Sequence, residues 1–445
     1  MAEGPQLRTA IPGPNAQKVV ARDTAALVRT TKCAPVVAAS AQGVYVTDVD
    51  GNRLLDFASG VSVVNTGHRH PKVLAAIRAQ LDQFVHVEGQ DFYYDVQVRL
   101  AERLAELAPL EAPAKSFFSN SGTEANEAAI KLARWSSGRP RLLAFLGAFH
   151  GRTLGALALT ASKPVHQAKV GPTIPGVHHV PFADCYRCPY KLDPSDCGTY
   201  CADVIEEQYF LRNLPPAEVA ACFFEPVQGE GGYVVPPAEF VRKLSRLCHD
   251  NGILLVADEV QSGMGRTGKL FAMEHFGIKP DIVTLAKSLG SGLPIGATLA
   301  RKGLDFGVSG AHSNTFGGNP VACASALATL DVLQQEDLIG NAARMGTYLH
   351  QRLLELQQRH EPIGDVRGMG LMQAIDIVKD RTSRAPNGPL AYAIVDAAIS
   401  KGLLLLSCGP SAIRVIPPLL ITSEQIDAGI EVLDAAIVQA IRASP

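Results

Sequence analysis

The sequence predicts an α/β protein in which helices cover both faces of a mostly parallel sheet. Four apolar runs carry this prediction, and they lie at 142–146, 219–224, 253–257 and 282–286. Their residues are apolar almost without interruption, as expected for strands that are buried on both faces. Stretches with helical spacing, such as 127–137 and 238–252, separate the runs, so strand and helix alternate along the chain.

The N-terminal part of the chain has a different pattern. Apolar and polar residues alternate over 44–58 around Asp50-Gly51, which predicts a hairpin. From Val73 to Leu107 the apolar spacing becomes helical. With 445 residues the chain is longer than one small core requires, so we expect an accessory lobe beside the large domain.

Beyond about residue 325 the pattern is mainly helical, with long amphipathic stretches at 338–360 and 423–443. Thr422 and Gln425 form a predicted capping box before the second stretch. We expect these helices to belong to a smaller α+β domain, which the N-terminal hairpin segment joins. The expected bounds are 1–69 for the N-terminal segment, 70–328 for the large domain and 329–445 for the C-terminal segment.

The composition is that of an ordinary globular protein, with 47% hydrophobic and 19% charged residues. The formal net charge of -2, with both signs interspersed, gives no reason to expect a polyanion or a membrane surface as partner. No apolar run approaches the ~18–20 residues of a membrane span. The first residues also lack the apolar core of a signal peptide. We therefore expect a cytoplasmic protein that binds neither nucleic acid nor a membrane.

Four of the nine cysteines are clustered. They have a C-x2-C…C-x3-C spacing and are Cys185, Cys188, Cys197 and Cys201. Thiolates at this spacing can bind zinc or an iron–sulfur cluster, or can form disulfides. They can equally stay free in a surface segment. None is expected to act in catalysis, and no metal is expected at the catalytic site.

Charged residues follow three of the apolar runs directly. Glu225, Asp258 and Lys287 occupy these positions. In open α/β sheets, ligands bind at the carboxyl ends of the strands, so we expect these three groups to meet there. A lysine and a carboxylate at such a place suggest pyridoxal phosphate (PLP): the lysine forms an imine with the cofactor aldehyde, and the carboxylate keeps the pyridine nitrogen protonated. The alternative interpretations are a surface lysine and a helix-capping aspartate.

A cradle for the cofactor phosphate is predicted at Ser121 and Glu124, which fit a capping box with Gly122 between them. Backbone amides and the helix dipole favour an anion at such a helix start. Most helix caps bind nothing, so the interpretation depends on the lysine and the aspartate found in the same chain.

A third group of candidates follows the run at 142–146. It consists of Phe149, His150 and Arg152. An aromatic ring can stack on a pyridine ring, and an arginine can bind a carboxylate through two hydrogen bonds. A loop arginine paired with a surface acid is the alternative.

With these motifs, the chain resembles the class III, or omega-type, aminotransferases of PLP fold type I, which include 4-aminobutyrate, ornithine and acetylornithine aminotransferases. The resemblance extends from about residue 40 to the C-terminus. It implies a large domain with a mostly parallel seven-stranded sheet covered by helices, and a smaller α+β domain. The motifs that carry it are NTGHRHP (65–71), NSGTEANEAAIKLAR (120–134), FHGRT (149–153), EPVQGEGG (225–232), LLVADEVQSGMGRTGKLFAMEH (254–275), TLAKSLGSGLPIGA (284–297) and NTFGGNP (314–320).

The resemblance also implies how the cofactor is bound. Lys287 is implied as the Schiff-base lysine and as the acid/base that moves a proton between Cα and C4′, and Asp258 as the partner of the pyridine nitrogen. Thr315 is implied to reach the phosphate in the neighbouring subunit of a homodimer, or of a dimer of dimers, with shared active sites. The other implied cofactor contacts are Val260 and Phe149 on the ring faces, Gln261 at O3′, Gly122 and Thr123 at the phosphate, and His150.

For the substrates, the resemblance implies a pair of small molecules, an amine donor and a 2-oxo acid acceptor. Arg414 is implied to bind the α-carboxylate of 2-oxoglutarate or glutamate, and Glu230 to pair with Arg414 when the donor has no α-carboxylate. Arg152 would bind the distal carboxylate, Val61 would line the pocket, and Glu225 would lie behind the cofactor contacts. The implied reaction converts a donor similar to 4-aminobutyrate and 2-oxoglutarate into a semialdehyde and glutamate.

Other functions stay open. The cysteine-bearing segment at about 183–206 is absent from familiar bacterial 4-aminobutyrate enzymes and is similar to a segment of archaeal relatives, some of which are ornithine aminotransferases and some amino-acid racemases. An ornithine-type aminotransferase or a racemase is therefore the alternative. A catalytically silent PLP-binding regulator is a third hypothesis, but the chain has no spare basic helix for nucleic acid.

Overall fold

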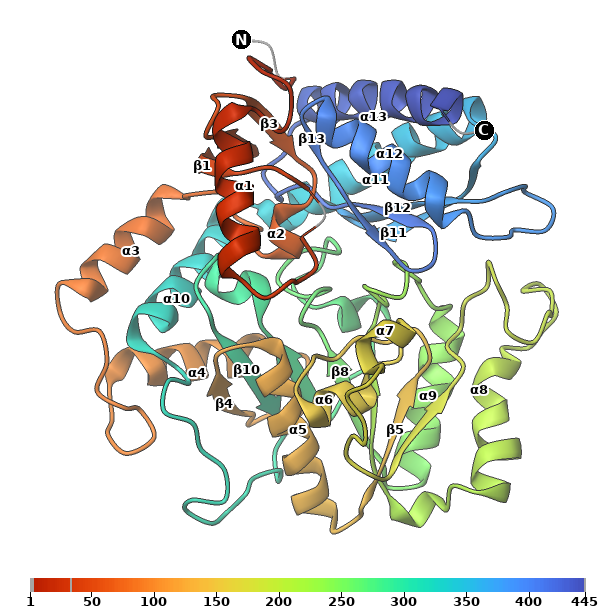
Figure 1. Ribbon diagram of the computed structural model, residues 1–445. Helices are drawn as coiled ribbons and strands as arrows, with labels where there is room; N and C mark the ends of the chain where they lie inside the picture. The colour runs from red at the N-terminus through yellow and green to blue at the C-terminus, as the bar shows by residue number, and fades with distance from the viewer. Residues whose placement is uncertain (1–3, 33, 444–445) are drawn as a thin grey trace.

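The computed structural model describes residues 4–32 and 34–443. Its central sheet has the strand order β4-β10-β9-β8-β7-β5-β6 (Figure 1). β10 runs antiparallel to both of its neighbours, and the pairs among the strands from β9 to β6 are parallel. The strands are β4 (Lys115–Ser119), β5 (Arg141–Phe145), β6 (Val177–Val180), β7 (Val219–Phe224), β8 (Leu254–Asp258), β9 (Ile282–Leu285) and β10 (Gly296–Ala300). The predicted α/β class and the mostly parallel seven-stranded sheet are confirmed.

Helices cover both faces of this sheet. Leu254 and Val256 of β8 belong to a hydrophobic cluster with α5 (Gly122–Ser137), whereas Leu255 and Ala257 belong to the cluster that contains α9 (Ala238–Asp250). Successive side chains of a strand point to opposite faces, which explains the uninterrupted apolar runs. The remaining helices of this part are α3 (Pro71–Leu81), α4 (Asp95–Leu107), α6 (Leu154–Leu159), α7 (Pro164–Gln167), α8 (Tyr200–Val204) and α10 (Pro320–Gln335), with short π or 3-10 segments at Ile205–Phe210, Pro216–Glu218, Ala272–His275 and Lys287–Gly290.

The two ends of the chain lie together above the central sheet in Figure 1. They share a sheet of order β1-β2-β3-β13, in which Leu55 of β3 pairs with Leu403 of β13. A second sheet has the order β11-β12-β15-β14. The elements are α1 (Pro14–Ala26), β1 (Ala38–Gln42), β2 (Tyr45–Asp48), β3 (Arg53–Asp56), α2 (Ser59–Ser62), α11 (Leu338–Arg359), β11 (Ile363–Met369), β12 (Met372–Ile377), α12 (Gly388–Ser400), β13 (Leu403–Leu404), β14 (Leu406–Cys408), β15 (Ala412–Val415) and α13 (Ser423–Ala443).

Several local predictions can be checked directly. The predicted hairpin is formed by the antiparallel strands β2 and β3, and the helical stretch from Val73 is divided into α3 and α4. The capping box is confirmed: Gln425 N–H donates to Thr422 Oγ1 at 3.3 Å, and Thr422 N–H donates to Gln425 Oε1 at 3.1 Å. The division into domains stays a prediction, and the boundary expected at 328/329 falls inside α10.

The contact between Phe57 and Gly429 provides a test of how the N-terminal segment packs on α13. Phe57 is fully buried, and a Cβ atom at Gly429 would overlap its ring. We expect Gly429→Ala to lower the free energy of unfolding by ~1–2 kcal/mol. Overpacking costs about 1–3 kcal/mol, and this exceeds the gain of up to about 1 kcal/mol for alanine over glycine in a helix.

Gly340→Ala is the matched control, because it is also helical and the three atoms nearest to its Cβ atom belong to the side chain of Asp337, which is 67% exposed and can move away. Urea denaturation of both variants measures the difference. Equal stabilities of the two variants would contradict the packing argument.

Candidate active site

A cavity of about 440 Å³ opens at the carboxyl ends of the central strands. Glu225, Asp258 and Lys287 meet at its wall, since each follows or ends one of the neighbouring strands β7, β8 and β9. The other predicted site residues on this wall are Gly122, Thr123, Phe149, His150, Arg152, Val260 and Gln261. The structure therefore brings together most of the residues that the sequence predicted for one site.

Lys287 stands just beyond β9 in an unusual backbone conformation. Its φ is 42°, in the left-handed region that residues with a side chain seldom adopt. Burial lowers the pKa of Lys287 below its ordinary value, although the negative charges of Asp258 and Glu225 act in the opposite direction. A lowered pKa favours the neutral amine, which is the nucleophilic form of lysine.

The carboxylate of Asp258 is held by a buried polar network. His150 Nδ1–H donates to Asp258 Oδ2 at 2.7 Å, and Asn126 Nδ2 donates to the same oxygen at 2.8 Å. Asn126 is fixed in turn by the Thr284 hydroxyl, which donates to it at 3.0 Å. Burial alone would lower the pKa of His150, but its hydrogen bond to Asp258 and the charges of Asp258 and Glu225 outweigh burial, so the pKa is raised. Sequence reasoning missed Asn126 and Thr284, although both lie in the recognised motifs.

The anion cradle is predicted at the start of α5, which lies on the cavity wall. Ser121 caps the helix, since its Oγ accepts from Glu124 N–H at 3.4 Å. The second hydrogen bond differs from that of the predicted capping box. The Glu124 carboxylate accepts from the backbone N–H of Asn120, at 2.7 Å, and not from that of Ser121. A Cβ atom at Gly122 would lie 2.8 Å from Val260 Cγ1, so any larger residue here would displace Val260.

Glu225 lies between Phe149 and the loop that follows β7. Its carboxylate accepts from Phe149 N–H at 2.9 Å and from Gly229 N–H at 3.0 Å. Burial raises the pKa of Glu225 to about 7, although the charge of His150 lowers it in part.

The predicted carboxylate-binding pair is closed. Arg414 Nη2 donates to Glu230 Oε2 at 2.6 Å, and the other oxygen of Glu230 accepts from Lys163 Nζ at 2.6 Å. Burial would raise the pKa of Glu230, but the two cations outweigh it and hold the pKa below its usual range. Lys163 is a contact that sequence reasoning missed. Arg152 stands on the cavity wall, with its guanidinium carbon 5.7 Å from the centre of the Phe149 ring.

Four predicted residues lie outside the lining of the cavity: Val61, Thr315, Glu230 and Arg414. Val63 lines it in place of Val61, which has a left-handed φ of 66° in the turn before it. Thr315 is exposed on a loop, and its predicted role concerns a neighbouring subunit. Glu230 and Arg414 lie beyond the lining residues, yet their charges act on the pKa of Lys287.

The cavity fits a PLP molecule in its chemistry. A lysine with a lowered pKa, a fixed carboxylate and a capped helix start surround one space. The amide oxygen of Gln261 is buried at this wall without a hydrogen-bond partner, as a residue that awaits a polar ligand would be.

The clustered cysteines lie apart from this cavity. All four have free thiols and line a small pocket of about 20 Å³. In the described part of the chain, no group of three or more His, Cys, Asp or Glu side chains is placed to hold a metal ion. Of the helices in the same ranges, none has the length and apolar character needed to cross a membrane. The expected cytoplasmic location stays a prediction.

The fold and the lysine–aspartate cavity define a PLP-dependent enzyme. The chain belongs to the class III aminotransferases, because the family model "Aminotransferase class-III" matches residues 27–437. It is 41% identical over 408 residues to the leucine/methionine racemase of Thermococcus litoralis, with 91% of each chain covered. It is also 41% identical over 404 residues to the 4-aminobutyrate aminotransferase GabT of Escherichia coli, which covers 90% of this chain and 92% of that protein.

Solved structures agree with this assignment. An amine transaminase from an uncultivated Pseudomonas species, solved in the PLP-bound form, has a TM-score of 0.86 and 36% identity and covers 91% of this chain and 95% of its own. The predicted family, PLP fold type I and the enzyme class are confirmed, and the cofactor of this family is PLP.

The raised pKa of His150 predicts a pH dependence of the apoprotein. A folded state that binds the proton more tightly than the unfolded state is most stable below the ordinary histidine pKa of 6.5 and loses this stability as the pH rises through the raised value. We expect His150→Gln to remove this part of the decline above pH 7. The raised pKa of Glu225 also makes the folded state less stable as the pH rises, but mostly below its pKa of about 7. Urea titrations between pH 6 and 9 measure the difference, and identical pH profiles would contradict the assignment.

Proposed function

We propose that the protein transfers the amino group of an omega-amino acid similar to 4-aminobutyrate to 2-oxoglutarate, and so produces a semialdehyde and glutamate. The Glu230–Arg414 ion pair carries this proposal, at 2.6 Å. When the pair is closed, a donor without an α-carboxylate meets a neutral wall. When it opens, Arg414 can bind the α-carboxylate of an oxo acid through two hydrogen bonds. Arg152, on the cavity wall, is proposed to bind the distal carboxylate of both substrates.

The residues of the chain have separate roles in this proposal. PLP supplies an electron sink for the bond that breaks at the amine-bearing carbon. Lys287 holds the cofactor and then moves a proton from that carbon to C4′ and back. Asp258 keeps the pyridine nitrogen protonated, and His150 and Asn126 hold its carboxylate in place at 2.7 and 2.8 Å. Val260 and Phe149 would pack against the cofactor ring, Gln261 would bond to its O3′ oxygen, and Gly122 and Thr123 would hold its phosphate.

We also propose a homodimer, or a dimer of dimers, in which Thr315 completes the site of the neighbouring subunit. Thr315 and Phe316 are both exposed, and Phe316 is 60% exposed, as residues of a contact surface would be in one isolated copy. Their loop is fixed to the central sheet, because Asn314 Nδ2 donates to the carbonyl of Phe118 at 3.0 Å.

An amino-acid racemase is the second candidate. It is favoured by the relatives named for racemisation, among them the Thermococcus litoralis enzyme at 41% identity. A racemase on this scaffold would use Lys287 in the same way, but the proton would return to the opposite face of the α-carbon. An ornithine-type aminotransferase would differ only in the amine donor.

The first prediction from this proposal concerns the overall reaction. Holoenzyme supplied with 4-aminobutyrate and 2-oxoglutarate should form glutamate, and Lys287→Ala should lower the rate at least about 10³-fold, since it removes both the attachment and the proton carrier. Chromatography of the amino acids measures the product. In parallel, L-leucine or L-alanine without any oxo acid is analysed on a chiral column. If the D-enantiomer forms and glutamate does not, the protein is a racemase and the proposed transamination is wrong.

The second prediction separates the two half-reactions. Glu230→Gln should lower kcat/KM for 4-aminobutyrate about tenfold, or ~1.4 kcal/mol, because Arg414 then meets this donor as an unpaired charge. The half-reaction with 2-oxoglutarate should change less than about threefold. Arg414→Gln should instead impair the half-reaction with 2-oxoglutarate more than the half-reaction with 4-aminobutyrate. Single-turnover absorbance measurements follow each half-reaction. Equal losses of rate in both half-reactions would exclude the proposal that Arg414 pairs in turn with Glu230 and with the α-carboxylate.

A further inference from the structure

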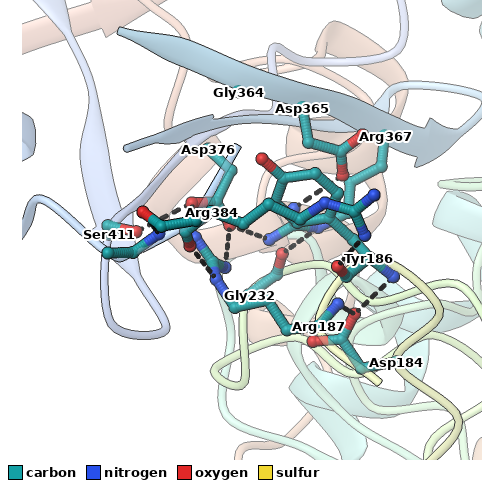
Figure 2. Close-up of polar contacts among 12 residues, drawn as sticks. Asp184, Tyr186, Arg187, Gly232, Gly364, Asp365, Arg367, Asp376, Arg384 and Ser411 are labelled. Carbon is teal, nitrogen blue, oxygen red and sulfur yellow. Dashed lines mark hydrogen bonds and ion pairs between the residues drawn. The ribbon is translucent and has the colours of Figure 1, made fainter. Parts of the chain in front are cut away.

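An ion pair ties the cysteine-bearing segment, residues 183–206, to the C-terminal sheet. Arg187 donates through its two Nη atoms to the two carboxylate oxygens of Asp376 in β12, each at 2.7 Å (Figure 2). A planar guanidinium matches a carboxylate in this two-point arrangement, which fixes orientation as well as distance. The pair therefore holds the segment at one defined place on β12.

Asp376 is fully buried and has two further donors. Arg367 of β11 and the hydroxyl of Ser411 each donate to it at 2.7 Å. Burial alone would raise the pKa of Asp376, but Arg187 and Arg367 hold it below its usual range. A buried carboxylate depends on such partners. Loss of Arg187 must therefore redistribute the bonds that remain to Asp376.

These donors connect Asp376 to the two segments that carry Glu230 and Arg414. Arg367 Nε donates at 2.8 Å to the carbonyl of Gly232, in the loop that carries Glu230 (Figure 2). Ser411 directly precedes β15, the strand that carries Arg414. Asp376 is thus connected through one donor to the loop of the acid and through the other to the strand of the arginine.

Apolar packing couples the same two elements. Side chains from the Glu230 loop, from β12 and from the β14–β15 region form one separate hydrophobic cluster: Val227, Tyr233, Met372, Ala374, Cys408, Ala412 and Ile416. Closely packed side chains transmit small displacements instead of absorbing them. A shift of β12 at Asp376 is therefore passed to the loop and to β15 together.

We propose that Arg187 is a positioning residue for the Glu230–Arg414 pair, and that the cysteine-bearing segment thereby sets how strongly the site distinguishes substrates with and without an α-carboxylate. Arg187 is not among the residues that line the cavity, so it acts through Asp376 and Arg367. The inference rests on the proposed function, because Arg414 is assigned there to the α-carboxylate.

The experiment compares Arg187→Gln with Arg384→Gln in the holoenzyme. Arg384 is the matched control: both guanidinium carbons lie 5.1 Å from the centre of the Tyr186 ring, but the Arg384 side chain bonds to the carbonyl of Tyr186 rather than to Asp376. Calorimetric titration uses glutarate, a dicarboxylate that engages Arg414, and butyrate, a monocarboxylate that does not. No turnover is needed for this readout.

We expect Arg187→Gln to weaken glutarate binding about fivefold to tenfold, in the range of coupling through packed networks, and to change butyrate binding less than about twofold. Arg384→Gln should leave both affinities within about twofold of wild type. Arg187→Lys, which retains the charge but not the two-point geometry, should fall between wild type and Arg187→Gln and keeps the test decisive if the glutamine variant unfolds.

Three outcomes would overturn the inference. Glutarate binding unchanged in Arg187→Gln would show that the segment does not position the pair. Equal weakening of glutarate and butyrate would show a general loss of structure. A wild-type holoenzyme with no preference for glutarate over butyrate would refute the proposed role of Arg414 itself, and this third result identifies a failure of the proposed function rather than of the positioning by Arg187.

Discussion

The buried carboxylate of Asp258 is the interaction on which the rest of the site depends. It is 4% exposed, and it is held at short distance by His150 and Asn126. A charged carboxylate that is removed from water depends on such partners. Its charge raises the pKa of His150 and opposes the effect of burial on Lys287. Burial still prevails at Lys287, so its amine loses a proton more readily than that of an ordinary lysine.

A second constraint connects this site to both ends of the chain. Arg266, in the loop beyond β8, is fully buried and donates to Asn65 Oδ1 and to the carbonyl of Pro417, each at 2.5 Å, and to the carbonyl of Leu371 at 3.1 Å. These acceptors come from the N-terminal segment, from the residues just beyond β15, the strand that carries Arg414, and from the turn between β11 and β12. Five donors in one rigid plane allow a single arginine to join three segments that are far apart in sequence.

The sequence predicted the parts of the fold that local pattern controls. The uninterrupted runs became β5, β7, β8 and β9, and the box at Thr422 caps α13 as expected. Pairing direction was not accessible in this way, because β10 is as fully buried as β9 although the two strands run antiparallel. β6 was missed since its sequence is half histidine, and the two histidines are only partly buried at the end of the sheet.

The same distinction holds for the site. Glu225, Asp258 and Lys287 could be placed together, because parallel strands bring their carboxyl ends to one edge. Contacts that involve loops have no such rule: Lys163 and Glu230 are 67 residues apart, and Arg187 is 189 residues from Asp376 in β12. Nothing in the local pattern at these positions predicts the partner. Val61 was chosen by resemblance, but the turn in which it has a positive φ presents Val63 to the cavity instead.

Lys163 has a consequence for the energetics of the proposed exchange of partners. Glu230 contacts two cations, one through each carboxylate oxygen, both at 2.6 Å. If Arg414 were its only partner, binding of an α-carboxylate would leave a partly buried anion unpaired, and that cost would oppose the oxo acid. With Lys163 in place, Glu230 keeps one ion pair when it releases Arg414. When the Glu230–Arg414 pair opens, Arg414 exchanges its charge-assisted hydrogen bond to Glu230 for bonding to the α-carboxylate of the substrate. The free-energy difference between the open and closed states is therefore small, so the site can accept substrates with and without an α-carboxylate.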